Sequence, residues 1–217
     1  MIINLCFHGI GSCVTEREPG ESRYWVAEDM FARILDQVVD RPDVRLSFDD
    51  GNASDAAIAL PALRERGLTA TFFVLAGRLD DRASLGAGEI RELRAATMRI
   101  GSHGWSHVPW RGLADSDAHR EFVEARQAIA EVSGAAVDEA AMPLGRYDRQ
   151  LLRRLRGADY RHVFTSDRVP ARSGSWMQPR YSATADDTTD SIAAILAQRV
   201  TVRTVRNVAV SFAKRIR

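Results

Sequence analysis

The sequence predicts an α/β protein whose parallel strands form an open sheet or a barrel. Short apolar, β-rich runs alternate with helical patterns over most of the 217 residues, and a repeated strand-helix unit is typical of parallel β/α folds. No Pro/Ser-rich linker and no internal repeat interrupts this alternation. We therefore expect one domain over residues 1–217, which is long enough to bury a sizeable core.

The expected strands are short apolar runs, and the expected helices carry apolar residues at helical spacing. Strands are expected at residues 2–7, 44–48, 70–75, 98–101, 140–143 and 162–165. Helices are expected at residues 27–39, 55–66, 88–96, 117–132, 148–156 and 188–198, with Ser54 and residues 115–117 as N-caps. Reactive side chains follow several of these strands. Because the C-terminal ends of parallel strands share one face, we expect those side chains to converge.

The overall charge argues against nucleic acid as a partner. The chain has 30 basic and 29 acidic residues, a net charge of +1, so no global field attracts a polyanion. No pattern in the sequence indicates the oligomeric state.

The C-terminal tail is basic. From residue 199 onward there is no acidic residue, and six residues are basic: Arg199, Arg203, Arg206, Lys214, Arg215 and Arg217. Apolar residues at 205, 208, 209, 212 and 216 recur at helical spacing, which predicts a basic amphipathic helix at about 199–217. We expect this helix to dock on the body and leave one face in water. Contact with an anionic membrane surface is the less favoured interpretation.

The N-terminal residues and the cysteines indicate a cytoplasmic location. No basic residue precedes the first apolar stretch and His8 interrupts it, which is unlike a secretory signal. Cys6 on a buried strand and Cys13 in a Gly-rich loop are expected to be free thiols in a reducing compartment.

Two carboxylates stand side by side at the end of the second expected strand, in Ser47-Phe48-Asp49-Asp50-Gly51. Adjacent strand residues point to opposite faces, so both carboxylates can enter one site only if the backbone turns there. Gly51 permits that turn. On its own, this motif fits an Asp-Gly turn or a helix cap as well as it fits a catalytic site.

Two histidines, His103 and His107, follow the fourth expected strand. Gly104 and Pro109 favour a loop at this point, and a loop can present both rings to one cation. Two imidazoles and one carboxylate are a common ligand set of catalytic zinc, with an open position for water. In isolation, a pair of loop histidines is as often on the surface or in ordinary hydrogen bonds as it is bound to a metal. The presence of both motifs at matching strand ends favours a joint site.

These motifs resemble those of polysaccharide deacetylases with the NodB-homology domain. Residues 47–51 are similar to the family's T/S-F-D-D-G motif, and residues 103–107 to its H-S/T-x-x-H motif. Residues 69–74 and 143–148 are similar to its A-T-F-F and P-Y-G-R-Y-D/N segments. The resemblance covers about residues 3–165 and implies a distorted, TIM-like (β/α) barrel with fewer than eight strands. It also implies a metal-dependent hydrolase that removes acetyl groups from N-acetylated or O-acetylated sugars.

The resemblance implies a role for individual residues. Asp50, His103 and His107 would bind one divalent metal ion, expected to be zinc, and Asp49 would be the general base. A cation with these ligands keeps a net positive charge, which acidifies water and polarises the acetyl carbonyl. The backbone N–H of Leu144 would donate to the oxyanion, although the family has an aromatic residue there.

Two departures from the family pattern stand out. The arginine that orients the base would fall near Ala141, and Arg180 is a candidate substitute, although a surface position is the favoured interpretation for it. The C-terminal L-x-H motif is missing, since no histidine follows His162. A permuted branch, the poly-N-acetylglucosamine deacetylases, instead carries a histidine in an N-terminal Y/F-H-x-I/V segment that residues 6–11 resemble. His8 would then be the general acid.

Trp105 and Tyr147 are candidates for stacking on a sugar ring, Trp105 more so because it lies between the two histidines of the metal motif. Two other functions stay open: a metal amidase of the same fold acting on a non-sugar substrate, and a catalytically silent carbohydrate-binding relative. The sequence does not identify the acetylated substrate, the N- or O-acetyl preference or the physiological metal.

Overall fold

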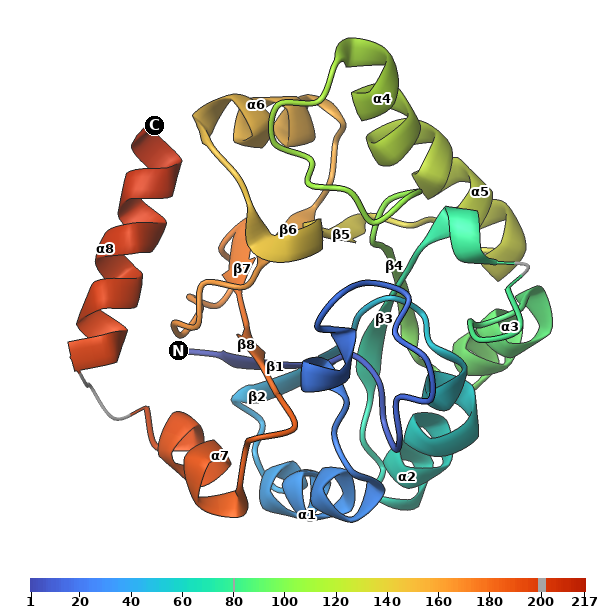
Figure 1. Cartoon of the computed structure of the whole chain (residues 1–217), viewed down its shortest axis with the longest axis vertical. Helices are drawn as coiled ribbons and strands as arrows, with labels where there is room; N and C mark the ends of the chain where they lie inside the picture. The colour runs from blue at the N-terminus through green and yellow to red at the C-terminus, as the bar shows by residue number, and fades with distance from the viewer. Residues whose placement is uncertain (80, 199–201) are drawn as a thin grey trace.

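Within residues 1–79, 81–198 and 202–217, which the computed structural model describes, eight parallel strands form a nearly closed barrel (Figure 1). Each strand pairs in parallel with its neighbours, in the order β7-β6-β5-β4-β3-β2-β1-β8. The strands are β1 (Ile3–Phe7), β2 (Val44–Phe48), β3 (Ala70–Val74), β4 (Arg99–Ser102), β5 (Glu139–Ala141), β6 (His162–Thr165), β7 (Met177–Pro179) and β8 (Tyr181–Ser182).

The expected barrel is confirmed, but the expected number of strands is wrong. All six predicted strands are present with bounds shifted by at most two residues, and β7 and β8 bring the number in the described chain to eight. β7 has three residues and β8 has two. Runs this short, one of them ending in Pro179, carry no periodic signal that sequence reasoning could use.

The barrel has a seam between β7 and β8, the two end strands of the sheet. The chain passes from β7 to β8 through a single residue, Arg180, and β8 then pairs with the free edge of β1. The side-chain amide of Asn4 in β1 donates to the Pro179 carbonyl at 2.9 Å and to Gln178 Oε1 at 3.2 Å. These contacts tie β1 to β7. The two short strands thereby bring Arg180 to the barrel interior, where it is 1% exposed.

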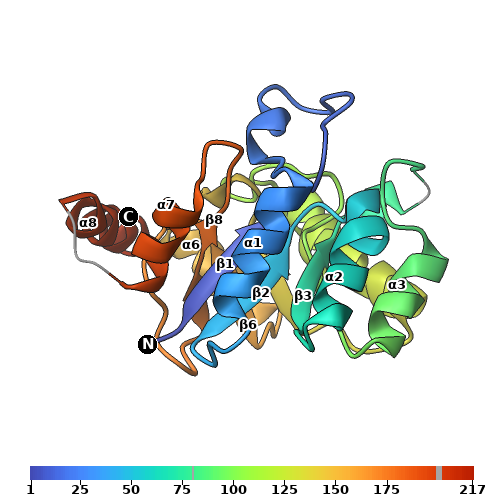
Figure 2. The same cartoon turned by 90° about the horizontal axis from the view of Figure 1, so that it is seen from below.

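Helices surround the barrel (Figures 1 and 2). They are α1 (Glu28–Val38), α2 (Leu60–Glu65), α3 (Ala87–Ala95), α4 (Asp115–His119), α5 (Ala125–Ser133), α6 (Arg149–Gly157), α7 (Thr189–Leu196) and α8 (Val202–Ile216). The helix α8 lies where the basic helix is expected, and residues 199–201 of that expectation fall outside the described residues. Among the described helices, none combines the length and apolar character needed to cross a membrane.

The expected N-caps are not formed by side chains. Ser54 has helical backbone angles, and its hydroxyl accepts the Ile10 N–H at 3.2 Å instead of closing a helix end. One π-helical turn, Asp55–Ala59, leads into α2, and a second, Arg120–Glu124, joins α4 to α5. The expected helices at 55–66 and 117–132 are therefore continuous but irregular.

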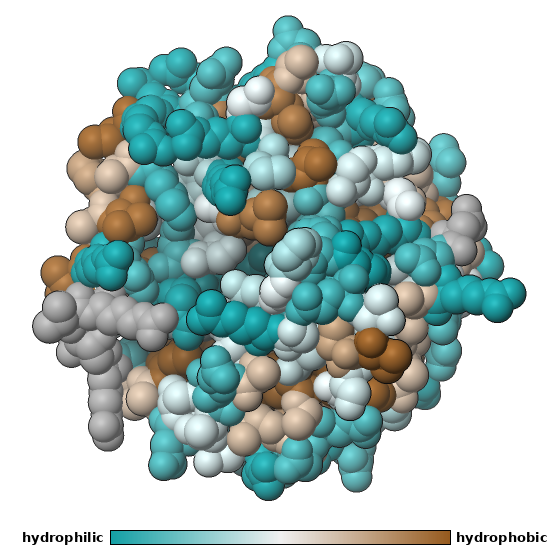
Figure 3. All heavy atoms as spheres, viewed as in Figure 1, coloured by the Kyte–Doolittle hydropathy of each residue, from teal (hydrophilic) through white to brown (hydrophobic). Residues whose placement is uncertain are grey.

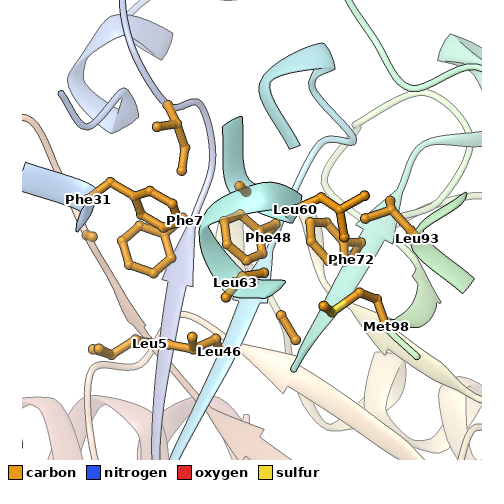
Figure 4. Close-up of a cluster of buried hydrophobic side chains, with 14 of the residues drawn as sticks. Leu5, Phe7, Phe31, Leu46, Phe48, Leu60, Leu63, Phe72, Leu93 and Met98 are labelled. Atoms are coloured by element: carbon orange, nitrogen blue, oxygen red, sulfur yellow. The ribbon is translucent and has the colours of Figure 1, made fainter. Parts of the chain in front are cut away.

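A row of aromatic rings packs between the barrel and its helices (Figure 4). Phe48 of β2 stacks on Phe72 at 4.6 Å and on Phe7 at 5.4 Å between ring centroids, and Phe31 of α1 meets Phe7 edge-on at 5.0 Å. All four rings are at most 1% exposed. Because side chains alternate along a strand, the outward direction of Phe48 directs Asp49 to the barrel interior. Packing on the outside thus places a reactive group on the inside.

Candidate active site

A pocket of about 290 Å³ opens at the C-terminal ends of the strands. The predicted residues that line it are His8, Asp49, Asp50, His103, His107 and Leu144. They follow β1, β2, β4 and β5, so the expected convergence at this face occurs. A larger cavity of about 400 Å³ lies beside Pro42 and Leu68 and contains none of them.

Asp49 and Asp50 both face this pocket because the backbone turns between them. Asp50 has a φ of 73° and Gly51 a φ of 63°, both in the left-handed region. That conformation costs a non-glycine residue about 1–3 kcal/mol and concentrates at functional sites. The side chains of Asp49 and Asp50 are buried, with 3% and 5% of each residue exposed. The turn expected at Gly51 is therefore present.

Arg180 binds Asp49 through two parallel contacts. Its Nη1 lies 2.5 Å from Asp49 Oδ1 and its Nη2 lies 2.7 Å from Oδ2. Phe73 and Phe164 flank the guanidinium at 5.3 and 5.7 Å from their ring centroids. Burial raises the pKa of Asp49, but Arg180 and His103 outweigh it, so the pKa of this carboxyl lies well below its usual range. The surface interpretation of Arg180 is wrong, because a buried carboxylate needs a buried cation.

A buried carboxylate shapes the loop that carries the two histidines. Glu121, in the π-helical turn between α4 and α5, accepts the backbone N–H of Trp105 at 2.7 Å and of Ser106 at 3.0 Å. Gly104 lies against this carboxylate with a φ of 89°, and a Cβ at that position would collide with Glu121 Oε2. The loop therefore requires glycine between the histidines for both its backbone angle and its space.

Hydrogen bonds fix the orientation of both imidazole rings. His103 Nδ1 lies 2.9 Å from the carbonyl oxygen of Ala141, and His107 Nδ1 lies 2.6 Å from Glu18 Oε1. Because both partners are acceptors, the contacts favour a proton on each Nδ1, the tautomer in which Nε2 can offer its lone pair to a cation. These Nε2 atoms lie 3.5 and 3.3 Å from Asp50 Oδ1. Burial lowers the pKa of His103 to about 4, which keeps its ring neutral near pH 7.

Asp50, His103 and His107 fit a divalent cation. Their ligand atoms all lie within 4.8 Å of one another, and donors at zinc-ligand distance from a tetrahedral centre are roughly 3.4 Å apart. Asp50 Oδ1 is buried and has no hydrogen-bond partner among the described residues, a deficit that a cation would satisfy. Burial raises the pKa of Asp50, but His8 and the two ligand histidines outweigh it and keep the pKa below its usual value.

His8 lies beside Asp49 at the end of β1. One ring nitrogen is within 4.8 Å of an Asp49 oxygen and of the Cys6 sulfur. This trio does not suit a metal, because burial raises the pKa of Cys6 well above its usual value and Arg180 holds both Asp49 oxygens. His8 Nδ1 is buried without a partner among the described residues, and the ring packs on Tyr24 at 4.8 Å. The arrangement suits proton transfer at His8.

Leu144 reaches the pocket through the turn Pro143–Gly145. Its backbone is in the left-handed region with a φ of 56°, and the residue is 51% exposed. Within the described part of the chain, its N–H has no hydrogen-bond acceptor. The donor is therefore available to a ligand.

The prediction that Tyr147 stacks on a sugar needs correction because its ring is buried, and neither Tyr147 nor Trp105 is among the described residues that line the pocket. Tyr147 is 1% exposed, and its hydroxyl donates to Asp167 Oδ2 at 2.7 Å. Burial, with the neighbouring Asp167 charge, raises the pKa of Tyr147 to about 12. Trp105 packs against Gly77, with the Arg120 guanidinium 4.7 Å from its ring centroid. Tyr147 therefore belongs to the packing behind the site, and a sugar contact of Trp105 stays a prediction.

A segment in which no site residue was predicted folds over the pocket. Residues 11–25 stand above the barrel as a long loop after β1 (Figure 2) and contribute Glu18 and Tyr24 to the lining. Besides His107, Glu18 Oε1 binds Arg78 Nη2 at 2.6 Å, and Arg17 binds Ser84 Oγ at 3.0 Å. A loop of this length next to a candidate catalytic histidine was itself a signal, since long loops in compact domains are usually functional.

The chain is thus a parallel β/α barrel that places one carboxylate and two histidines, the donor set of many catalytic metal sites, at the C-terminal ends of its strands. Residues 36–163 match the polysaccharide deacetylase family, and the chain belongs to that family.

Two curated proteins show the range of this similarity. The chain is 29% identical over 149 residues to a chitooligosaccharide deacetylase of Rhizobium leguminosarum bv. trifolii, an alignment that covers 68% of this chain and 65% of that protein. It is 23% identical over 124 residues to YxkH of Bacillus subtilis (strain 168), which covers 57% of this chain and 44% of that one. The chain thus matches less than two thirds of the length of either relative.

Solved structures share the fold over almost the entire chain. The Streptococcus pyogenes deacetylase PplD, in complex with acetate, matches with a TM-score of 0.75 and 18% identity, covering 92% of this chain and 98% of that one. IcaB from Ammonifex degensii matches with a TM-score of 0.72 and 21% identity, covering 91% and 97%. At identities of 18% and 21%, this structural similarity establishes the barrel fold and does not extend to function.

Proposed function

We propose that this chain hydrolyses the acetyl group of N-acetylated sugars in a glycan or glycan precursor, with O-acetylated sugars as the variant substrate. Membership of the polysaccharide deacetylase family supports the reaction type. The observation that carries the proposal is the contrast between neighbouring carboxylates in one pocket. Asp49 is held by Arg180 through two contacts, whereas Asp50 faces two imidazole Nε2 atoms with an unpartnered oxygen.

We propose zinc as the ion that Asp50, His103 and His107 hold. When bound, it would acidify a water molecule and polarise the acetyl carbonyl. The contacts of Ala141 and Glu18 with the two Nδ1 atoms orient both rings so that their Nε2 atoms can bind the ion.

Asp49 is the proposed general base. Because Arg180 keeps its pKa well below the usual range, Asp49 stays charged at neutral pH and can accept a proton from the attacking water. The two-point contact also fixes the plane of the carboxylate, so the base does not have to be oriented during the reaction.

Leu144 is proposed to stabilise the tetrahedral intermediate, and His8 is proposed to protonate its leaving group. The Leu144 N–H donates to the developing oxyanion, for which a preorganised donor of this kind is worth about 2.7–4 kcal/mol. The amine leaves only when it is protonated, and His8 is placed at the same end of the barrel to deliver that proton. Tyr24, which packs on His8 and lines the pocket, is the aromatic residue best placed to contact the sugar.

Acetate release from a panel of substrates tests this function. The panel contains acetylated oligosaccharides, lipid-linked acetylated sugars, simple acetyl esters and non-sugar amides, with Asp49→Asn as the inactive control. We expect acetate from N-acetylhexosamine oligomers with wild-type protein and none above background with the variant. Release from non-sugar amides alone would instead identify a metal amidase. No release from any substrate, with metal bound, would identify a silent carbohydrate-binding relative.

The cytoplasmic location stays a prediction, and cell fractionation tests it.

A further inference from the structure

The helix α8 docks on the barrel through polar side chains. Ser211 is 3% exposed and its hydroxyl donates to Asp167 Oδ2 at 3.0 Å, while Lys214 Nζ lies 2.9 Å from Asp167 Oδ1. The Asn207 amide donates to the Arg168 carbonyl at 3.3 Å. An amphipathic helix on a globular body usually buries its apolar face, so this docking reverses the usual arrangement.

The anchor of this docking is the carboxylate of Asp167. Burial raises the pKa of Asp167, but hydrogen bonds from Tyr147 and Lys214 outweigh it, so the pKa lies below its usual value. Asp167 is 7% exposed and therefore remains a buried charge that needs these donors. Ser211 and Lys214 satisfy it, and this requirement turns the polar face of α8 inward.

As a consequence, α8 presents its apolar face to water. Val205, Val208, Phe212 and Ile216 are 61%, 52%, 63% and 61% exposed. Their spacing of three, four and four residues places them on one face of the helix. In the space-filling view, hydrophobic residues gather along the edge of the molecule where α8 lies (Figure 3). Single exposed apolar residues are ordinary, whereas a continuous stripe indicates a contact surface.

Cations lie on both sides of this apolar stripe. At about 100° per residue, Arg215 lies about 20° from one edge of the stripe, and beyond the other edge exposed Ala209 and Ala213 lead to Arg206 and Arg217, about 80° and 100° from the stripe. All three arginines are exposed. No acidic residue occurs from 199 to 217 to offset them.

The apolar surface continues from the helix onto the body. A groove of about 330 Å³ lies beside α8, and its lining includes Met1, Val208 and Phe212 together with Arg172 and Arg215. Met1 is 62% exposed. The groove combines apolar walls with two guanidinium groups, a combination that suits a ligand with an apolar body and an anionic end.

We propose that the exposed face of α8 lies on an anionic membrane surface. The stripe would enter the boundary of headgroups and acyl chains, and the flanking arginines would bind lipid phosphates while their stems cover apolar surface. Charge complementarity selects this occupant over a second copy of the chain, because two such faces brought together would oppose cations of the same sign. The proposal concerns where the enzyme works and is independent of its proposed reaction.

Vesicle binding tests the proposal. Sedimentation of the protein with vesicles of phosphatidylcholine alone, and of phosphatidylcholine with phosphatidylglycerol, should show binding to the second only, weakening as salt rises. Phe212→Ser should reduce the binding constant about tenfold or more. Arg206→Gln should reduce it about fivefold, which corresponds to about 1 kcal/mol per cation near the surface.

A matched pair of valines on the same helix provides the control. Val205→Ser removes part of the stripe, whereas Val210→Ser changes an exposed valine about 140° away around the helix. Only the first should weaken binding, with both variants unfolding at the same temperature as the wild type. Failure of the wild type to bind anionic vesicles, or equal binding to both vesicle types, overturns the proposal. A wild-type dimer that Val205→Ser converts to a monomer, without lipid binding, identifies a second copy as the occupant.

Discussion

The two sides of the pocket are built in different ways. On the side proposed to bind metal, called the metal side, Asp50 follows β2 and the two histidines lie in one short loop after β4, so each motif is contained in five consecutive residues. On the side proposed to transfer protons, called the proton-transfer side, His8 follows β1, and Arg180 reaches Asp49 from 131 residues further along the chain. The metal side is therefore local in sequence, whereas the proton-transfer side depends on how the barrel closes.

This difference implies that the two sides can be disabled separately. Substitutions on the metal side should remove metal and activity together. Substitutions on the proton-transfer side should reduce activity while the metal stays bound.

Replacing a ligand histidine should have the largest effect. His103→Ala removes one of three ligand atoms, so we expect metal content to fall from about one ion per chain to nearly none and acetate release to fall to background. Metal analysis of the purified protein measures this directly. His119→Ala, whose side chain is 61% exposed, is the control and should keep both properties. Equal metal content in all three proteins would refute the site.

Replacing His8 should reduce turnover without removing metal. His8→Ala removes the proposed proton donor, and general acid catalysis is worth about 10²- to 10⁴-fold. Turnover on an N-acetylated oligosaccharide should fall by that factor, with metal content and thermal stability unchanged. Unchanged turnover in this variant would show that another group supplies the proton.

Replacing Arg180 should change the pH dependence of the reaction. Arg180 holds the pKa of Asp49 below its usual range, so Asp49 remains charged as the pH falls. In Arg180→Gln the pKa of Asp49 should rise. The acidic limb of the plot of kcat/KM against pH should therefore move to higher pH. Arg180→Lys, which keeps the charge, should move the limb less. An acid limb at the same pH in all three proteins would exclude Asp49 as the base that Arg180 holds.

The same ion pair has a consequence for stability. A carboxyl whose pKa is depressed in the folded state contributes stability above its unfolded pKa, and this contribution is lost as the pH falls through its folded pKa. Breaking a buried pair by removing one partner costs about 3–5 kcal/mol. Urea unfolding at neutral pH should therefore show Arg180→Gln to be less stable than Arg180→Lys.

The smallest expected effect concerns Glu18. Its contact with His107 Nδ1 orients a ligand, and loss of such a contact typically weakens metal affinity 10- to 100-fold. Glu18→Gln should do so while turnover at saturating metal changes little. Glu16→Gln, in the same loop and bonded to Ser22, is the control. Equal metal affinity in both variants would show that Glu18 serves only to hold the loop.

What the sequence could predict follows the same division between local and distant features. Six strands were predicted because each is a run of apolar residues, and the metal side was predicted because its spacing is local. β7 and β8 were missed because they are too short to show a period. Arg180 was assigned to the surface because no local pattern reveals that it closes the barrel seam against Asp49.

Which face of an element is buried could not be predicted from the sequence either. The helical spacing of the C-terminal tail identifies the residues that share a face of α8, but the buried Asp167 determines which face docks. Likewise, Tyr147 lies inside a motif that resembles the family's, yet tertiary packing buries its ring. Which face of an element is buried depends on contacts with residues that are far away in the sequence.

Metal reconstitution tests whether acetate release requires one metal ion bound by the two histidines and Asp50. The protein is stripped of metal with a chelator, titrated with Zn²⁺ and assayed for acetate release from an N-acetylated oligosaccharide. Release should be absent without metal and should rise to a plateau at about one ion per chain, as expected for one carboxylate and two histidines acting as a single site. Full acetate release from the stripped protein would contradict the account.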